Sequence, residues 1–364
     1  MKPLFHIKKT LILTIVLCIT ASAWCAVEKK NVLITGGAGY IGSQTCKALY
    51  QAGYQPIAYD NLSKGHKELV KWGPLEIGDI SDRQMLKEVI AKYNPVAVIH
   101  FAALKAVGES VADPAKYYFN NVYGTLVLLD TLRETGIKNV IFSSTAAVYG
   151  IPEISVVTEE SAVQPINPYG HSKAMVEQIL KDFEKAYGLR FVCLRYFNAA
   201  GADLDLEIGE RGNDPKNLIP IAMRVIAKQQ KELAIFGNDF ETPDGTAIRD
   251  YIHVADLADA HIKALEYLLN GNPSIILNLG TGEGVSVMEV VKEAQTVSHS
   301  PLPTVLAPRR EGDPPHLTAD CSKAQHLLHW TPQHSDLNTI ISTEWRWLCQ
   351  LLHIGPNSPH LGTK

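Results

Sequence analysis

Short apolar runs alternate with amphipathic stretches over the first half of the chain. The apolar runs cover residues 32–35, 56–59, 75–77, 96–100, 139–143 and 191–195. The stretches with helical periodicity extend to about residue 52 and then cover residues 82–93, 114–134 and 168–187. Such alternation is typical of strand–helix–strand units, in which helices cover a parallel sheet. The pattern therefore predicts an α/β protein with a doubly wound parallel sheet.

The regular alternation weakens after Asn198, where loops rich in Gly, Asp and Pro cover residues 201–215, 237–245 and 301–315. We expect a first domain over residues 27–197 and a smaller C-terminal α/β lobe over residues 198–364, with some segments of the lobe returning to the first domain. The chain has 364 residues, of which 46% are hydrophobic and 20% charged, and this composition is that of a globular protein. It excludes a disordered or fibrous chain.

Residues 1–26 have the pattern of a secretory leader. Lys2, Lys8 and Lys9 precede an apolar run over residues 11–19, and Ala21-Ser22-Ala23 fits a signal-peptidase site. The run is shorter than the roughly 20 residues of a membrane-spanning helix, so we expect no permanent span. Export is one interpretation; the other is a cytoplasmic protein that starts at Val27 from a non-Met codon. N-terminal sequencing of the native protein distinguishes the two.

Charge and cysteine content exclude several kinds of partner. The formal net charge is -4, and Lys and Arg are scattered, so no basic face is expected for nucleic acid. The six cysteines form no Cys-x-x-Cys pair. We therefore expect neither a disulfide framework nor a metal site.

A glycine-rich loop follows the first predicted strand. Residues 31–43 read NVLITGGAGYIGS, with Gly36, Gly39 and Gly42 between the strand and a helix. Glycines at such a place permit a tight turn and allow the backbone to approach a pyrophosphate at the helix N-terminus. The loop predicts a Rossmann-type dinucleotide site. Asp60, at the end of the second strand, suits a ribose hydroxyl and repels a 2′-phosphate, which favours NAD over NADP.

Tyr169 and Lys173 stand four residues apart at the start of a predicted helix, so their side chains share one face. A free phenol has a pKa near ~10 and is a poor base at neutral pH. We expect Lys173, together with a positively charged nicotinamide, to lower the pKa of Tyr169. A Tyr and a Lys at this spacing are common in proteins. The interpretation as a catalytic pair is strengthened by Thr145, which lies at the end of a predicted strand, at the sheet edge where ligands bind.

An ordered series of motifs resembles the UDP-glucose 4-epimerases of the extended short-chain dehydrogenase/reductase family. It comprises TGGAGYIGS, HFAALKAVGES, YYFNNVYGT, FSSTAAVYG, PYGHSK, RYFNAAGA, NLIP, LAIFGND, DGTAIRDYIHV, NLGTG and PRREGD. The resemblance extends from Val32 to about Trp347. The leader is its main departure, since members of the family are normally cytosolic.

The resemblance implies a set of NAD-binding residues. The glycine loop would hold the pyrophosphate with backbone donors from Tyr40 and Ile41, and Asp60 and Asn61 would hold the adenosine ribose. The remaining implied contacts are those to adenine and along the cofactor channel: Asp79, Ile80, Phe101, Ala102, Lys105, Asn120 and Tyr196.

The resemblance also implies which residues act on a UDP-sugar. Tyr169 would be the acid/base and Lys173 its partner. Thr145 would stand where many members have Ser. Its hydroxyl is kept, but its extra methyl group could shift the hydrogen bond and lower the rate. The residues implied to hold the substrate are Asn198, Asn217, Leu218, Leu233, Phe236, Arg249, Arg310, Asp313 and Leu317. Arginines suit a diphosphate because the guanidinium group pairs bidentately with phosphate oxygens.

The implied activity is reversible inversion at carbon 4 of UDP-glucose and UDP-galactose, with NAD bound throughout. In the family, one position controls whether an N-acetyl group at sugar carbon 2 fits the site, and this position matches Leu317. The intermediate size of Leu predicts some activity on UDP-GlcNAc and UDP-GalNAc. The family also implies a homodimer formed by the helices near 114–134 and 168–187. A 4,6-dehydratase lacks support because Ala146-Ala147 stand where its Asp-Glu pair belongs. Two alternatives remain, a 4-epimerase of UDP-pentoses or UDP-uronates and a non-catalytic NAD-sensing module.

Overall fold

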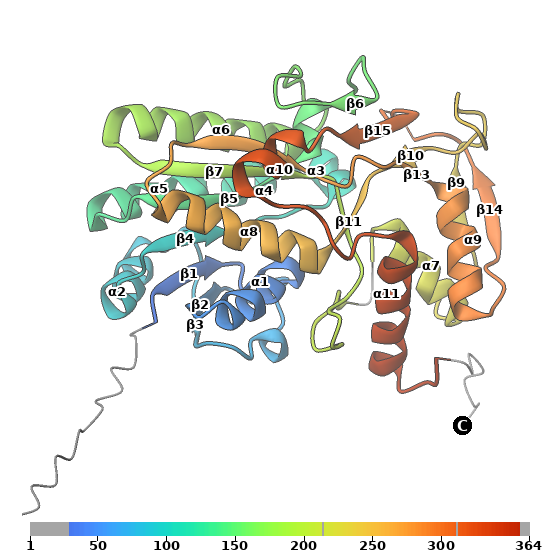
Figure 1. Ribbon diagram of the computed structural model, residues 1–364, viewed down its shortest axis with the longest axis horizontal. Helices are drawn as coiled ribbons and strands as arrows, with labels where there is room; N and C mark the ends of the chain where they lie inside the picture. The colour runs from blue at the N-terminus through green and yellow to red at the C-terminus, as the bar shows by residue number, and fades with distance from the viewer. Residues whose placement is uncertain (1–28, 213–214, 311, 357–364) are drawn as a thin grey trace, which may run out of the picture.

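The computed structural model describes residues 29–212, 215–310 and 312–356. The leader predicted over residues 1–26 lies outside these ranges. Figure 1 shows a larger unit, built on a central sheet, beside a smaller unit that contains three helices. These three are α7 (Leu218–Ile226), α9 (Val287–Ser298) and α11 (Leu337–Leu352).

The central sheet has seven parallel strands in the order β12-β7-β5-β4-β1-β2-β3. The strands are β1 (Asn31–Thr35), β2 (Gln55–Asp60), β3 (Leu75–Ile77), β4 (Ala97–His100), β5 (Asn139–Thr145), β7 (Arg190–Tyr196) and β12 (Ile275–Leu279). The strand order reverses between β1 and β4, and ligands of such sheets bind at the carboxyl ends of the strands beside this point. The predicted doubly wound α/β fold is confirmed.

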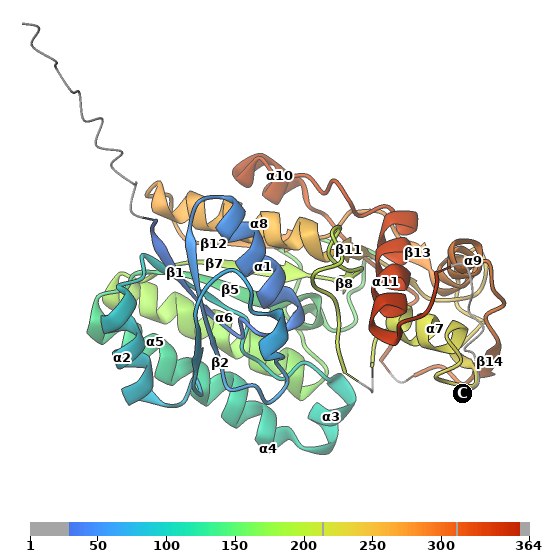
Figure 2. The ribbon, with the colours of Figure 1, turned by 90° about the horizontal axis from the view of Figure 1, so that it is seen from below.

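Helices cover both faces of the sheet because successive side chains of each strand point to opposite faces. In β1, Val32 and Ile34 pack into one apolar core and Leu33 into the other. One face is covered by α1 (Tyr40–Gln51), α8 (Val254–Leu269) and α10 (Ser322–Leu328), and the other by α2 (Arg83–Tyr93), α5 (Gly124–Thr135) and α6 (Pro168–Tyr187), as Figure 2 shows in part.

Local sequence signals explain where the helices begin and end. Asn167 caps α6, since its side chain accepts a hydrogen bond from Gly170 N, and Pro168 occupies the first turn. Gly188 ends α6 in the left-handed conformation, with φ of 69°. The helix predicted near 114–134 is a helical run of three parts, α4 (Pro114–Tyr117), a π-helical stretch (Tyr118–Tyr123) and α5. Helix α3 (Val107–Ala112) was not predicted.

The chain crosses between the two units more than once after β7. Within the larger unit, β12 pairs with β7, and α8 packs against the sheet, so residues 254–279 return to the first domain. The remaining short strands are β6 (Val156–Val157), β8 (Asn198–Ala200), β9 (Leu233–Phe236), β10 (Ile248–Arg249), β11 (Tyr251–His253), β13 (Val285–Ser286), β14 (Thr304–Ala307) and β15 (His316–Ala319). Two short 3₁₀ turns cover Lys67–Leu69 and Ala146–Tyr149.

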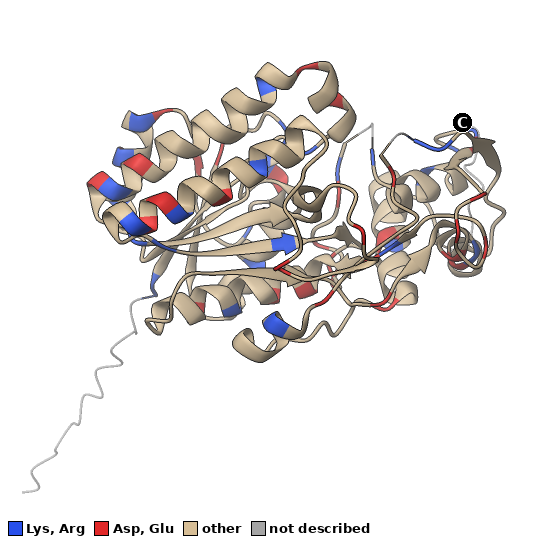
Figure 3. Cartoon of the chain, turned by 90° about the horizontal axis from the view of Figure 1, so that it is seen from above, with Lys and Arg blue, Asp and Glu red and all other residues tan. Residues whose placement is uncertain are grey.

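The smaller unit has an apolar core of its own. Side chains of α7, α9 and α11 meet β9 there, and Trp345 of α11 and Met223 of α7 are fully buried among them. Within the described residues no helix combines the length and the apolar character needed to span a membrane. Figure 3 shows acidic and basic residues interspersed along the helices.

Candidate active site

The glycine loop joins β1 to α1 at the switch point of the sheet. Gly36 has φ of 76°, and a Cβ there would lie 2.7 Å from Ala102 N. A Cβ on Gly42 would lie 2.1 Å from Gly36 O. Gly39 precedes the first turn of α1, whose amides, those of Tyr40 and Ile41 included, have no acceptor within the helix. The loop is therefore a cradle without side chains at a helix N-terminus, which fits a pyrophosphate.

Asp60 lies at the end of β2 and supports this loop. Its buried carboxylate accepts hydrogen bonds from Ala38 N at 3.0 Å and Leu62 N at 2.8 Å. Asn61 donates to Asp79 Oδ2 at 2.7 Å, and Ile80 is buried beside them. The four residues predicted at the adenosine end therefore lie together at the ends of β2 and β3.

Three of the residues predicted for the cofactor channel lie just after β4, and Asn120 lies in the π-helical stretch. Phe101 packs on the ring of His261 at a centroid distance of 4.6 Å, and the backbone of Ala102 lies against Gly36. Lys105 is exposed and pairs with Glu210 at 3.3 Å. Asn120 donates to the buried Asn121 at 2.8 Å.

The Tyr–Lys pair lies beside the carboxyl ends of β5 and β7. Thr145 at the end of β5 lies near Tyr169 at the start of α6, and its hydroxyl opposes the rise in the pKa of the phenol. Lys173 is buried one turn further along α6, and its Nζ donates to Ser143 O at 2.7 Å. The Ser143 hydroxyl in turn pairs with the Tyr196 phenol. Five side chains from β5, β7 and α6 thus converge on one edge of the sheet.

Burial dominates the pKa values at this edge. It raises the pKa of Tyr169, and the Thr145 hydroxyl opposes this rise. Burial also lowers the pKa of Lys173 to about 7, against the opposing charges of Cys193 and Glu177. Lys173 Nζ donates to the Ser143 carbonyl, and the lowering of the Tyr169 pKa by Lys173 together with a bound nicotinamide stays a prediction.

A second group of predicted residues meets in the smaller unit. Asp313 pairs with Arg310 at 2.7 Å and with Arg249 at 3.5 Å. The Arg310 guanidinium lies 5.0 Å from the centre of the Phe236 ring, which is 40% exposed. Two cations, one carboxylate and an exposed aromatic face thus share one place, although the residues lie far apart in the sequence. This set can bind a phosphorylated aromatic base.

The other predicted substrate residues lie around these two groups. Leu317 pairs in register with Arg249 and packs against an apolar cluster that contains Ala146 and Val157. The Asn198 side chain donates to Asp250 O at 2.8 Å. Leu233 is buried in the core of the smaller unit, whereas Asn217 is exposed at the start of α7 and Leu218 is partly buried there.

Two important polar residues were not predicted. Buried Asp250 accepts hydrogen bonds from Thr281 N, Gly282 N and Ala319 N, and so joins the loops beside Asn198. Asn121 joins the loop after β4 to Ser172 of α6. Their partners are distant in the sequence, so no local spacing could have indicated them.

The described residues contain one group with the spacing of a metal site, Asp203, Asp205 and Glu207. The Lys47 ammonium already contacts all three carboxylates. The four cysteines within the described ranges are free and buried.

A doubly wound sheet with a glycine loop at its switch point and a Tyr–Lys pair beside it defines a dinucleotide-binding enzyme that acts on alcohols. Residues 32–280 match the model of the NAD dependent epimerase/dehydratase family. The match spans more than half of the chain, and the chain belongs to this family. The resemblance found in the motifs is thereby confirmed.

Relatives with known names agree with this assignment. The chain is 51% identical over 318 residues to the UDP-glucose 4-epimerase of Rhizobium leguminosarum bv. trifolii. The aligned region covers 87% of this chain and 97% of that protein. The crystal structure of the Brucella ovis UDP-glucose 4-epimerase in complex with NAD is 51% identical, with a TM-score of 0.86 and coverage of 87% and 98%. The Bifidobacterium longum enzyme in complex with NAD+ and UDP is 40% identical, with a TM-score of 0.83 and coverage of 90% and 99%.

Proposed function

We propose that the protein is an NAD-dependent UDP-glucose 4-epimerase, which interconverts UDP-glucose and UDP-galactose. One observation carries the proposal. Thr145 and Tyr169 lie together at the edge of the central sheet, and Arg249, Arg310 and Asp313 form a cluster in the smaller unit. Leu317, which pairs in register with Arg249, joins the two groups. Relatives at 51% identity that carry this name support it.

The residues present fit NAD. The Gly36 and Gly42 positions exclude any side chain, and the first turn of α1 offers free amides to a pyrophosphate. Asp60 and Asn61 suit an unphosphorylated ribose, while Tyr196 and Lys173 flank the nicotinamide end. Bound there, NAD would supply a hydride acceptor and donor for sugar carbon 4 and a positive charge that favours the Tyr169 phenolate.

The side chains of this chain move the proton. Tyr169, as a phenolate, accepts the proton of the sugar 4-hydroxyl, and it returns the proton when the hydroxyl is restored. The Thr145 hydroxyl, which lies near the phenol, stabilises the same oxygen. Lys173 is buried beside Ser143, where little water screens its charge when it is protonated.

Inversion requires the 4-keto hexose to turn over while the nucleotide stays in place. Arg249 and Arg310 bind the diphosphate, Asp313 the ribose, and the Phe236 ring the uracil. Binding free energy thus resides at the nucleotide end, and the hexose is held loosely. The test is to incubate the purified protein with UDP-galactose and no added dinucleotide. We expect UDP-glucose as the product; a protein without bound NAD, or one that leaves UDP-galactose unchanged, contradicts the proposal.

Leu317 sets the size of the sugar pocket near carbon 2. It packs against the apolar cluster that contains Ala146 and aligns with Arg249, so we place it between the catalytic and the phosphate ends. We expect the protein to turn over UDP-GlcNAc as well as UDP-galactose. We expect Leu317→Tyr to lower kcat/KM for UDP-GlcNAc by about tenfold or more and to spare UDP-galactose, since a larger side chain excludes the acetyl group. The check is kinetics on both sugars; turnover confined to UDP-glucose and UDP-galactose contradicts this part.

The protein forms a homodimer through the helices that were predicted for it. Phe119, Tyr123 and Leu126 are 71%, 53% and 40% exposed, and their spacing of four and three places them on one face of the helical run. Met175 of neighbouring α6 is 45% exposed. Such a cluster of exposed apolar side chains is typical of an interface.

We expect Phe119→Glu to convert the dimer to a monomer, because it places a charge in the apolar interface. Sedimentation equilibrium measures the mass. Leu306→Glu changes an apolar residue on β14 that is 61% exposed and serves as the control, with no expected change in mass. A Phe119→Glu protein with unchanged mass contradicts the interface.

A further inference from the structure

Residues 201–210 form a strap between the cofactor side and the substrate side of the site. The strap follows β8, so it begins three residues after Asn198. Ala202 and Ile208 of the strap are fully buried, together with Leu69 and Trp347. A loop that is buried in this way contributes to the interior of the molecule rather than only connecting two elements.

One face of α1 holds the strap on the cofactor side. Tyr40 donates to Gly201 O, and Gln44 Nε2 donates to Asp203 Oδ1 at 3.0 Å. Lys47 Nζ donates to Asp203 Oδ2 at 2.7 Å. The spacing of 40, 44 and 47 places these side chains in one row on the helix that begins at the glycine loop.

Lys47 is the centre of the charges in this contact. Its Nζ lies 2.7, 2.8 and 2.9 Å from Asp203, Asp205 and Glu207. The side chains of Lys47 and Asp203 are only 5% and 3% exposed, so their attraction is weakly screened. Without the ammonium, three carboxylates would repel one another, and the strap would lose its strongest contact with α1.

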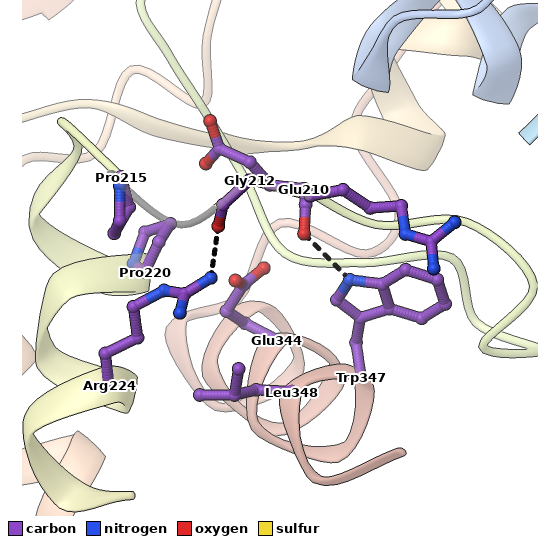
Figure 4. Close-up of a pocket in the computed structure, with 9 residues that line it drawn as sticks. Glu210, Gly212, Pro215, Pro220, Arg224, Glu344, Trp347 and Leu348 are labelled. Atoms are coloured by element: carbon purple, nitrogen blue, oxygen red, sulfur yellow. Dashed lines mark hydrogen bonds between the residues drawn. The ribbon is translucent and has the colours of Figure 1, made fainter. Parts of the chain in front are cut away.

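One face of α11 holds the strap on the other side. Thr343 Oγ1 accepts from Ala202 N at 3.1 Å, Trp347 Nε1 donates to Glu210 O at 3.0 Å, and Gln350 Nε2 donates to Leu206 O at 3.1 Å. The spacing of 343, 347 and 350 repeats that of the row on α1. Figure 4 shows the Trp347 contact beside the hydrogen bond from Arg224 of α7 to Gly212 O. The strap is therefore clamped between a helix of each unit.

We propose that the strap fixes the spacing between α1 and α11, and that Lys47 is the positioning residue that holds it in place. The proposal rests on the epimerase function proposed above. Asn198 and the strap are parts of one stretch of chain, so a loosened strap displaces the substrate unit relative to the glycine loop. The nucleotide and the hexose are then held less tightly, and the hexose loses its alignment with Tyr169.

The experiment compares Lys47→Met with Lys47→Arg and with the unsubstituted protein. Lys47→Met keeps the side-chain length and removes the charge. We expect it to raise KM for UDP-galactose and Kd for UDP, measured by calorimetry, by about tenfold, since small misplacements of bound groups have effects of up to about 10²-fold. Lys47→Arg keeps the charge, so its KM and Kd stay close to those of the unsubstituted protein.

Leu86→Ala is the control for stability alone. Leu86 is fully buried in α2, in the apolar core on the opposite face of the sheet from α1. If Lys47→Met lowers the thermal midpoint as Leu86→Ala does but leaves KM and Kd unchanged, the role is only structural and the proposal is overturned. If Lys47→Met does not fold, Gln44→Leu takes its place, because it removes one hydrogen bond to Asp203; unchanged KM and Kd in that variant overturn the proposal as well.

The experiments distinguish a failure of the proposal about the strap from a failure of the proposed epimerase function. An unsubstituted protein that binds UDP but does not epimerise UDP-galactose contradicts the function. The UDP affinities of the variants still decide the role of Lys47 in that case.

Discussion

Tyr169→Phe is expected to lower kcat for UDP-galactose by about 10²–10⁴-fold, the usual contribution of a positioned acid/base. The substitution removes only the phenol oxygen near Thr145. The ring stays, so the packing at the start of α6 is kept and the purified variant should still carry NAD. The measurement is kcat together with the dinucleotide released on denaturation.

The matched control is Tyr93→Phe. The Tyr93 phenol lies at the end of α2 and donates to Glu76 at 2.6 Å, far from the site. We expect its kcat to equal that of the unsubstituted protein. A Tyr169→Phe enzyme that turns over at a similar rate would remove Tyr169 from the mechanism.

Glu177→Gln is expected to lower the free energy of unfolding by about 3–5 kcal/mol, the cost of breaking a buried ion pair by removing one partner. Glu177 of α6 binds Arg195 of β7 through two hydrogen bonds, of 2.5 and 2.9 Å, and both side chains are at most 4% exposed. Ser144 donates to the same carboxylate at 2.6 Å. The pair thus fixes α6, which carries Tyr169 and Lys173, to the sheet.

Denaturant unfolding curves measure the change for Glu177→Gln. Glu134→Gln breaks an exposed pair with Arg83 on the helices of the same face and should cost at most about 1 kcal/mol. A loss of stability in Glu177→Gln no greater than that of the control would show that the buried pair does not hold α6.

Periodicity in the sequence predicted most of the larger unit, because its strands and helices carry the pattern that buries them. Strand β12 was not predicted, because its short apolar run resembles other buried segments and only its pairing with β7 identifies it as a strand. Strands of two residues, such as β10 and β13, are too short for any period. Their position depends on hydrogen bonds to segments far away in the chain.

Some residues of the candidate site could be predicted from the sequence and others could not. Tyr169 and Lys173 were predicted from helical spacing, and the glycines from their place after β1. The cluster of Arg249, Arg310 and Asp313 came from the family resemblance, since no spacing relates β10 to a loop 60 residues later. Asp250 and Lys47 were missed because their partners come from other elements. Burial, which the sequence does not reveal, raises the pKa of Tyr169, and the lowering expected from Lys173 with a bound nicotinamide stays a prediction.

The most direct test of the proposed reaction follows the hydrogen at carbon 4. UDP-galactose deuterated at carbon 4 is incubated with the protein in ordinary water and without added dinucleotide, and the UDP-glucose formed is analysed by mass spectrometry and NMR. Removal and return of the same hydrogen predict that the product keeps its deuterium at carbon 4. Product that carries solvent hydrogen there would contradict the proposed reaction.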